Sequence, residues 1–377
     1  MKIILFVPQN AWMIAHDFSI HRLGRYFKNV KNVKTVVIKI DNKKLDGEFD
    51  NGEYVDEVIN VVTQEELFKT IKDLNPDLIF HRSWMLAYPF AAELVKRFNN
   101  VVVNIKDWNF AAKEEYEFIF PNNGSDFEAV EYIFKNSKYI LSHYTSEQAT
   151  IWAKEYNVKE DKFIFFPEYC NKDNFKSKII KYEDISLVFA GMISQTGSPE
   201  QLFPWKSHIR SIHKITKQNI NIDFVLPEKV YNRVFTDKNL YLDWLYENQF
   251  NDRMNLIKGE TLTSEVLHKY HFGFFELETS GVNKELYEYA VVSKFAFYLE
   301  SSLPILVNKD FKSISKIVDK YGIGIIYSNE ELDHFNEILN ISQEEYNKMI
   351  NNICKFRQTY TYEDNSKTIN KILKTKQ

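Results

Sequence analysis

The residue types that suit a phosphate site lie close together in the second half of the sequence. The loop Thr279-Ser280-Gly281 follows a run of strand-forming residues and precedes a predicted helix that carries Lys294. Backbone N–H groups at a helix start, with the positive end of its dipole, favour anions, and a lysine adds a full positive charge. The loop and Lys294 predict a pyrophosphate site, with a hydrogen bond from Lys294 to a ribose as the alternative.

Two carboxylates lie on the same predicted helix. Glu285 and Glu288 are one turn apart, so they share a helix face, and either side chain can accept hydrogen bonds from ribose hydroxyls. The opposing interpretation is that Lys294, Glu285 and Glu288 form a solvated surface, because charges at helical spacing usually face water.

In the first half, polar residues follow predicted strands. Arg82 comes soon after the strand 77–80, and the pair Lys106-Asp107 directly follows the strand 101–105. The carboxyl ends of parallel strands meet at one edge of a sheet, where α/β proteins bind ligands. We expect the pair His81-Arg82 to bind a diphosphate or an acceptor, against the alternative of structural pairing. We expect Lys106 and Asp107 in the same site.

A histidine lies in the loop after the first predicted strand. His16 stands beside Asp17, and an imidazole titrates near neutral pH, so it can bind acceptor hydroxyls or relay a proton. The structural alternative is that Asp17 caps the helix that follows.

These candidate residues need a framework that brings strand ends together. Short apolar runs alternate with amphipathic helical windows through both halves of the chain. This alternation is typical of parallel sheets that helices cover on both faces. The predicted strands are 2–7, 35–40, 57–62, 77–80, 101–105, 138–142, 162–166, 186–190, 221–226, 254–258, 271–276, 304–307 and 323–327.

We therefore expect an α/β protein of two Rossmann-like domains, whose parallel sheets face an interdomain cleft. The predicted domains are residues 1–170 and 185–360, joined by a polar linker that is rich in Lys and Asn. The tail, 361–377, is predicted to form a last helix that packs back on the N-terminal domain.

The composition excludes several classes of protein. A chain of 377 residues is long for a single core. Its 48 Lys and Arg against 52 Asp and Glu give a net charge of -4, which excludes a basic nucleic-acid binder. Two cysteines and nine histidines in no clear ligand spacing predict a reducing compartment and no metal site. Without a secretory signal or a membrane-spanning stretch, we expect a cytoplasmic protein.

Several segments resemble a known family. The segment Ser293–Val307, followed by Tyr321–Ile325, resembles the nucleotide-sugar-binding motif of GT-B glycosyltransferases of the group 1, GT4-like type. The strand 186–190 with Gly191 resembles the first strand of that family's C-terminal domain. The resemblance implies the GT-B fold, with an acceptor site in the N-terminal domain and a donor site in the C-terminal domain that includes Gly191 and Lys294.

The sequence departs from the family pattern at the ribose contact. The family usually has a glutamate where Phe297 stands. An apolar ring cannot accept a hydrogen bond from a hydroxyl, so Glu285, Glu288 or Glu300 would have to take over that contact.

Other departures concern the phosphate and acceptor contacts. Met192 stands where an arginine is common in the family, and Lys206 would replace a lysine that is usually closer in sequence. Lys106 stands where the family has a histidine, and Ser302 where it has a glycine. Altered donor contacts favour, as an alternative, a non-catalytic nucleotide-sugar-binding partner of an active transferase.

The resemblance predicts a glycosyltransferase that moves a sugar from a nucleotide-sugar donor, a UDP-sugar favoured, to a surface-glycan, lipid-linked or protein acceptor. It implies no metal and no cofactor besides the donor substrate. Lys294, the amides of the 279–281 loop, and Lys206 or Arg82 would stabilise the leaving diphosphate. Retention is expected, whereas inversion would make Asp107 or His16 the base. A GT-B-shaped sugar-nucleotide epimerase is a further alternative.

One helix is a candidate for contact with a membrane. The segment 309–320 is rich in lysine, which suits the surface of an anionic bilayer, with a solvated surface as the alternative.

Overall fold

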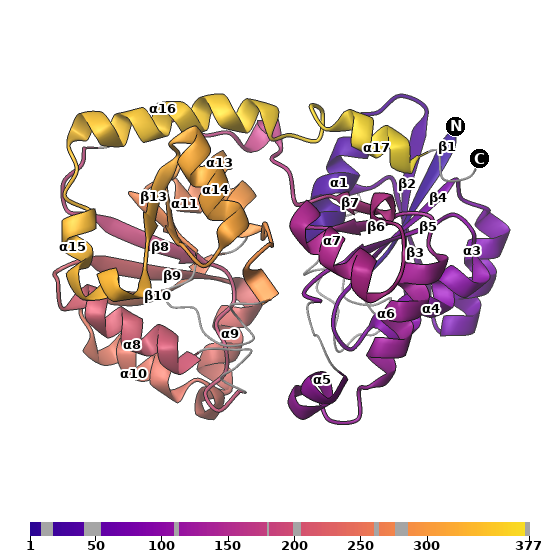
Figure 1. Cartoon of the computed structure of the whole chain (residues 1–377), viewed down its shortest axis with the longest axis horizontal. Coiled ribbons are helices and arrows are strands. Elements are labelled where there is room, and N and C mark those ends of the chain that lie inside the picture. Colours follow the sequence, from indigo (N-terminus) through magenta and orange to yellow (C-terminus); the bar gives the residue numbers. More distant parts are fainter. Residues whose placement is uncertain are drawn as a thin grey trace. The chain divides into compact units, whose positions relative to one another are not determined.

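The computed structural model divides the chain into two compact units (Figure 1). Unit 1 comprises Met1–Tyr169 and Tyr362–Gln377, and unit 2 comprises Cys170–Thr361. Across the described residues, no helix is both long and apolar enough to cross a bilayer. The described residues are 1–8, 18–40, 54–108, 113–178, 181–198, 205–259, 264–275 and 286–373.

Unit 1 contains a sheet of seven parallel strands in the order β3-β2-β1-β4-β5-β6-β7. Every residue of β5 is buried, and all but Asn104 are apolar, as is typical of a strand covered on both faces. The strand order reverses between β1 and β4, and open α/β sheets bind ligands at the carboxyl ends beside such a reversal. The strands are β1 (Lys2–Val7), β2 (Val33–Ile40), β3 (Glu57–Val61), β4 (Leu78–Ser83), β5 (Val101–Ile105), β6 (Ile140–Ser142) and β7 (Phe163–Phe165).

Helices connect the strands of unit 1. The α3 helix begins after Thr63, whose side chain accepts a hydrogen bond from the N–H of Glu66, and ends at Asn75 in a left-handed conformation. The helices are α1 (Phe18–Lys28), α3 (Gln64–Leu74), α4 (Tyr88–Arg97), α5 (Lys113–Ile119), α6 (Ser125–Asn136), α7 (Ser146–Glu155), α17 (Ser366–Ile372) and the short 3-10 helix η2 (Glu160–Lys162).

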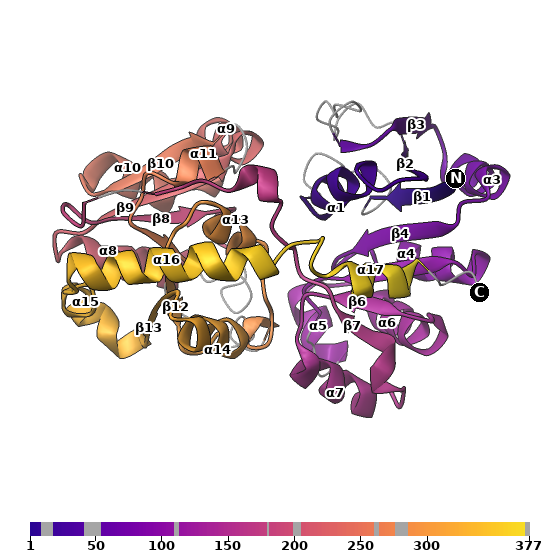
Figure 2. The same ribbon diagram turned by 90° about the horizontal axis from the view of Figure 1, so that it is seen from above.

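The last helix of the chain belongs to unit 1. In both views α17 lies with the elements of the N-terminal half (Figures 1 and 2). Just before α17, the ring of Tyr362 is fully buried and lies 5.4 Å from the ring of Tyr169 and 5.7 Å from that of Tyr26, between centroids. These aromatic contacts attach the tail to unit 1.

Unit 2 contains a second parallel sheet, of six strands in the order β10-β9-β8-β11-β12-β13. The two sheets confirm the predicted α/β architecture of parallel sheets. The strands are β8 (Ser186–Ala190), β9 (Asn221–Pro227), β10 (Met254–Gly259), β11 (Phe272–Phe274), β12 (Ile305–Asn308) and β13 (Gly324–Tyr327).

A tyrosine fixes one helix of unit 2 on this sheet. The hydroxyl of Tyr298 donates a hydrogen bond to the carbonyl of Phe274 and accepts one from the N–H of Ala190. Its ring lies so close to Gly273 that a Cβ there would be 2.5 Å from it, so β11 needs a glycine at this position. The helices are α8 (Trp205–Thr216), α9 (Glu228–Thr236), α10 (Leu242–Phe250), α11 (Ser264–Leu267), α13 (Lys294–Glu300), α14 (Lys312–Tyr321), α15 (Phe335–Ile338), α16 (Gln343–Thr359), and the 3-10 helices η3 (Lys172–Asn174), η4 (Lys238–Leu240) and η5 (Asn329–His334).

The structure differs from the sequence-based expectation in the segment 170–184. Its first residues pack against unit 2 and do not form a free linker. The N–H of Asn171 donates to a carboxylate oxygen of Glu300 at 2.7 Å, and the ring of Phe175 lies under the guanidinium of Arg357 at 4.4 Å. The polar composition did not predict this packing, because the contacts are made with residues far along the chain.

Two helices also differ from expectation. The segment 228–236, for which we expect no helix, forms α9. The predicted helix 284–299 is interrupted: Leu286 and Tyr287 are helical, residues 288–293 are not, and α13 begins at Lys294. The residues before it, Val291 and Val292, are β-branched, and side chains branched at Cβ lower helix propensity.

Candidate functional site

Lys294 lies at the carboxyl ends of two neighbouring strands of unit 2. It is the first residue of α13, and its Nζ donates a hydrogen bond to the carbonyl of Phe275, which follows β11 directly. The same Nζ lies 3.6 Å from the centroid of the Phe189 ring in β8. The side chain is half-buried. Partial burial and the π-face of Phe189 hold the ammonium at this edge of the sheet.

Gly191 lies beside Lys294. It follows β8 with a φ of 149°, a backbone conformation that favours glycine. A Cβ at this position would be 3.9 Å from Cε of Lys294. The structure therefore brings together two predicted donor-site residues, at the strand ends where α/β sheets bind ligands.

Five predicted site residues lie outside the described residues. They are His16, Thr279, Ser280, Gly281 and Glu285, and their assignment stays a prediction.

Glu288 lies within the described residues and forms an ion pair. Its carboxylate forms an ion pair with Lys312 of α14, and its carbonyl accepts a hydrogen bond from the N–H of Ser313. This hydrogen-bonded carboxylate raises the pKa of Lys312. Glu288 and Lys294 do not share one helix, contrary to the sequence prediction, because α13 begins only at Lys294.

Glu300 cannot replace the missing ribose-binding glutamate. Its side chain is buried and accepts hydrogen bonds from Asn171 at 2.7 Å and Asn174 at 3.3 Å. Phe297 is also buried. Ser302, at the position where the family has glycine, adopts a φ of 54° and donates to the carbonyl of Lys176. This part of the motif is built into the core of unit 2.

Lys206 and Met192 are exposed. Lys206 lies in the first turn of α8, with its ammonium 5.3 Å from the centroid of the Trp205 ring. Met192 is 70% exposed. Their positions leave the phosphate role of Lys206 a prediction.

In unit 1, the ends of β4, β5 and β6 lie side by side. Ser83 is opposite Ile105, and Ile105 is opposite Ser142 in the sheet register. The residues that follow these strands therefore meet at one edge of the sheet. Arg82 is the second-last residue of β4 and is half-buried. Lys106 and Asp107 directly follow the last residue of β5.

Lys106 is held in a buried ion pair, and its catalytic role stays a prediction. Its Nζ contacts both carboxylate oxygens of Glu168, at 2.9 and 3.1 Å, and both side chains are almost completely buried. Its carbonyl also accepts a hydrogen bond from Tyr88. A buried ammonium needs such a carboxylate, since an isolated buried charge is costly. Glu168 is 62 residues away from Lys106, so no local pattern predicts the pair.

Asp107 has the properties of a functional carboxylate. It adopts a φ of 51°, which is uncommon for a residue with a side chain. One carboxylate oxygen accepts a hydrogen bond from Nε1 of Trp84 at 2.6 Å. Burial raises the pKa of Asp107, and the charges of Arg82 and Lys106 partly offset this increase. Strained backbone and a shifted pKa are both frequent at functional sites.

Two histidines near this edge of the sheet are buried, His81 in β4 and His143 after β6. His143 lies near Asp107, and it is not among the predicted site residues. Nε2 of His143, directly after β6, lies 3.8 Å from the other Asp107 oxygen. Burial and the charge of Lys106 hold the pKa of His143 well below its usual value. Burial lowers the pKa of His81 to about 4, and its Nδ1 lies 2.9 Å from the carbonyl of Val7. Both imidazoles are neutral at pH 7. The position of His143 directly after a predicted strand could have indicated it as a site residue from the sequence.

This edge of unit 1 can bind a hydroxyl group. Asp107 supplies an acceptor, and Arg82 supplies positive charge beside it. No three His, Cys, Asp or Glu side chains within the described ranges are grouped so as to hold a metal ion.

Part of unit 2, with part of the tail that follows it, matches the model of one protein family. The model of the family "Glucosyltransferase 3-like, C-terminal domain" matches residues 237–369. This range includes Lys294 and the strands β10 to β13. No curated protein sequence matches the chain.

Solved structures match the whole chain. Anabaena HepE in complex with UDP-glucose is 11% identical, covers 99% of both chains and has a TM-score of 0.66. The chain has the GT-B glycosyltransferase fold. Sucrose-phosphate synthase from Thermosynechococcus elongatus is 12% identical over 99% of this chain and 98% of its own, with a TM-score of 0.65. The N-terminal domain of Candida albicans trehalose-6-phosphate phosphatase is 10% identical, covering 100% of this chain and 97% of its own, with a TM-score of 0.62.

Proposed function

We propose that this GT-B protein is a glycosyltransferase that takes a sugar from a nucleotide-sugar donor, a UDP-sugar favoured, and transfers it to a hydroxyl of a glycan, lipid-linked or protein acceptor. The observation that carries the proposal is the position of Lys294. Its ammonium lies at the carboxyl ends of β8 and β11, beside Gly191. A fixed cation at this edge suits a diphosphate.

The donor step rests on charge stabilisation. When the bond between sugar and diphosphate breaks, negative charge grows on the leaving phosphate, and a preorganised cation lowers the energy of that transition state. Lys294 is held by Phe275 and Phe189, so it needs little reorganisation. HepE, which has the same fold, was solved with UDP-glucose. We propose that Lys294 makes this reaction independent of a metal.

The acceptor step rests on unit 1. Asp107 would accept a hydrogen bond from the acceptor hydroxyl, and the positive charge of Arg82 would stabilise the Asp107 carboxylate. We propose a retaining reaction, in which Asp107 positions the acceptor. In an inverting reaction Asp107, with its raised pKa, would itself take the proton.

The first experiment is a thermal-shift screen with UDP, GDP, CMP, ADP and their sugars, because a ligand that binds only the folded protein raises its melting temperature. The responding sugar nucleotide is then used in an assay of donor hydrolysis and of transfer to glycan acceptors. We expect Lys294→Ala to reduce turnover at least tenfold, since a hydrogen bond to a charged group contributes about 1.5–3 kcal/mol. Exposed Lys348 in α16 gives the control Lys348→Ala. No thermal response to any nucleotide contradicts the proposal.

A second candidate is a non-catalytic partner that binds the nucleotide-sugar. The buried Phe297, where the family has a ribose-binding glutamate, favours this alternative. It predicts a thermal shift with a sugar nucleotide but neither hydrolysis nor transfer by the purified chain.

A further inference from the structure

Helix α10 presents an apolar ridge to solvent. Leu242, Tyr246 and Phe250 recur at every fourth position, so they lie along one face of the helix. They are 55%, 61% and 63% exposed. The rings of Tyr246 and Phe250 contact each other, with 4.8 Å between centroids. Contiguous exposed apolar side chains mark interaction surfaces.

The ridge is not needed for the core of unit 2. The opposite face of α10 packs inward through Trp244, which is fully buried and donates a hydrogen bond to the carbonyl of Ser194. Leu240, just before α10, extends the exposed apolar surface at 38% exposure.

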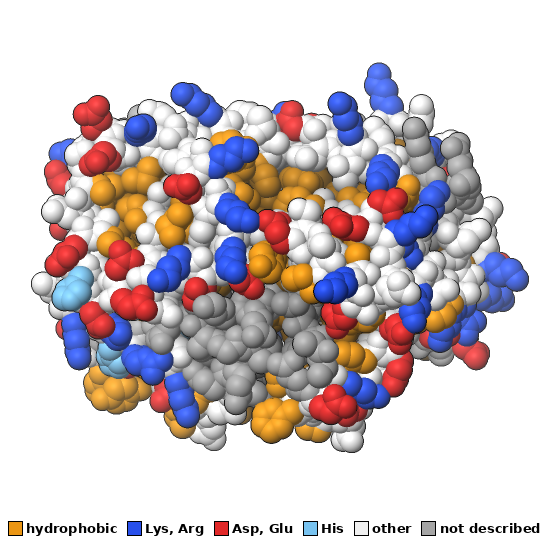
Figure 3. Space-filling view, viewed as in Figure 1, with side chains coloured by type: hydrophobic (Ala, Val, Ile, Leu, Met, Phe, Trp, Pro, Cys, Tyr) orange, Lys and Arg blue, Asp and Glu red, His pale blue; other side chains and the backbone are white. Residues whose placement is uncertain are grey.

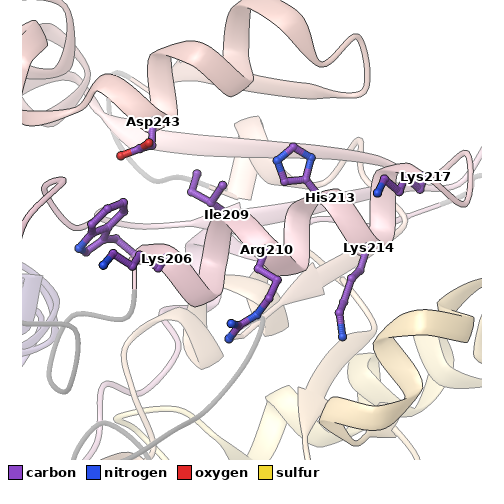
Figure 4. Close-up of a pocket in the computed structure, with 8 residues that line it drawn as sticks. Lys206, Ile209, Arg210, His213, Lys214, Lys217 and Asp243 are labelled. Carbon is purple, nitrogen blue, oxygen red and sulfur yellow. The ribbon is translucent and has the colours of Figure 1, made fainter.

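Beside the ridge, α8 is a basic helix with no acidic residue. A cavity of about 630 Å³ runs along α8 and reaches Asp243 of α10. Lys206, Arg210 and Lys214 project along one side of α8, while Ile209, His213 and Lys217 lie nearer Asp243 (Figure 4). The lining residues are Trp205, Lys206, Ile209, Arg210, His213, Lys214, Lys217 and Asp243.

Positive charge exceeds negative charge on this surface. The cavity lining contains four Lys or Arg and one Asp. Neighbouring carboxylates compensate part of it, because His213 pairs with Glu247 and Lys214 with Asp333, both at 2.9 Å. Apolar and basic side chains gather over α8 and α10 in the space-filling view, at the lower left (Figure 3).

We propose that α8 and α10 form a docking surface for an anionic lipid bilayer. Exposed Leu, Tyr and Phe side chains enter the boundary between headgroups and acyl chains, and adjacent Lys and Arg attract anionic headgroups. Trp205 stands at the start of α8 and adds an aromatic side chain to the basic row. A second copy of this chain fits the surface less well, because a symmetric dimer through α10 would bring two basic α8 helices together. The lysine-rich segment 309–320 is not part of this surface.

Vesicle sedimentation tests the proposal with the full chain. One set of vesicles contains phosphatidylcholine alone, and the other contains a third phosphatidylglycerol. We expect binding to the anionic vesicles only, with weaker binding at high salt. The variant Tyr246→Ser/Phe250→Ser should bind at least tenfold more weakly. The variant Lys206→Gln/Lys217→Gln should lose roughly fivefold per lysine.

Two control variants match these changes elsewhere in the chain. Phe118→Ser removes a side chain of unit 1 that is 78% exposed, and Lys69→Gln/Lys72→Gln removes two exposed lysines of α3. Both controls should bind vesicles like the wild type. The proposal is overturned if the chain binds neither vesicle, binds both equally, or loses binding equally in the controls. A dimer that Tyr246→Ser/Phe250→Ser dissociates, without vesicle binding, would overturn it in favour of a second copy.

Discussion

The buried ion pair between Lys106 and Glu168 gives the sharpest test of the structure of unit 1. The two side chains are 4% and 3% exposed, and the ammonium contacts both carboxylate oxygens. Removing one partner leaves a buried charge without compensation, at a cost of about 3–5 kcal/mol. We expect Lys106→Met and Glu168→Leu each to lower the free energy of unfolding by about this amount. This corresponds to a loss of roughly 6–20 °C in melting temperature.

The double variant separates the ion pair from other causes of instability. Replacing both charges with apolar side chains of similar volume is often neutral or stabilising. Lys106→Met/Glu168→Leu should therefore recover most of the stability that either single variant loses. The double-mutant cycle should give a coupling energy of about 3 kcal/mol or more.

Urea unfolding followed by tryptophan fluorescence measures these differences, since Trp84, Trp108 and Trp152 all lie in unit 1. The control is Lys113→Met, which breaks an exposed pair with Glu128 and should leave stability nearly unchanged. If each single variant costs less than about 1 kcal/mol, or the double variant is as unstable as the two losses added, the buried pair has been misjudged.

Three further predictions concern single positions. Asp107→Ala should reduce sugar transfer at least tenfold while the UDP-induced thermal shift stays; unchanged transfer would remove Asp107 from the site. Burial lowers the pKa of His81 from 6.5 to about 4, so between these pH values the unfolded chain binds a proton that the folded chain does not. The free energy of unfolding should fall by roughly 3 kcal/mol as the pH drops through this range, and urea titrations of His81→Gln should show a smaller fall. Gly273→Ala should cost about 1–3 kcal/mol in calorimetry, because its Cβ would meet the Tyr298 ring; an unchanged melting temperature would contradict this packing.

The parallel strands were predictable from the sequence. The run Val101–Ile105 is completely buried, and Ser186–Ala190 is buried except at its first residue. A strand covered on both faces is mostly apolar, so its position can be recognised in the sequence, although Asn104 is a buried polar residue in β5. The strand ends then indicated where Arg82 and Asp107 meet.

The chemistry at the strand ends was harder to predict. Lys106 and Asp107 are adjacent and follow the same strand, and nothing local says which side chain turns inward. The answer depends on Glu168, which the fold brings to Lys106 from beyond β7. His143 escaped notice for the same reason, because its nearness to Asp107 arises only when β5 and β6 pair.

The predicted helix at the donor site is interrupted in the structure. Glu285 and Glu288 are one turn apart in a predicted helix that also carries Lys294, but residues 288–293 are not helical and α13 begins at Lys294. Glu288 instead pairs with Lys312 of α14. The carboxylate of Glu300 accepts hydrogen bonds from Asn171 and Asn174, which belong to a segment whose polar composition predicts a linker.

The most direct test of the donor site is calorimetric titration of the wild type and of Lys294→Ala with UDP and with uridine. If the Lys294 ammonium binds the diphosphate, the variant should bind UDP roughly tenfold or more weakly, while its affinity for uridine, which has no phosphate, should not change. Equal affinity of both proteins for UDP would contradict the assignment of this strand edge as the diphosphate site.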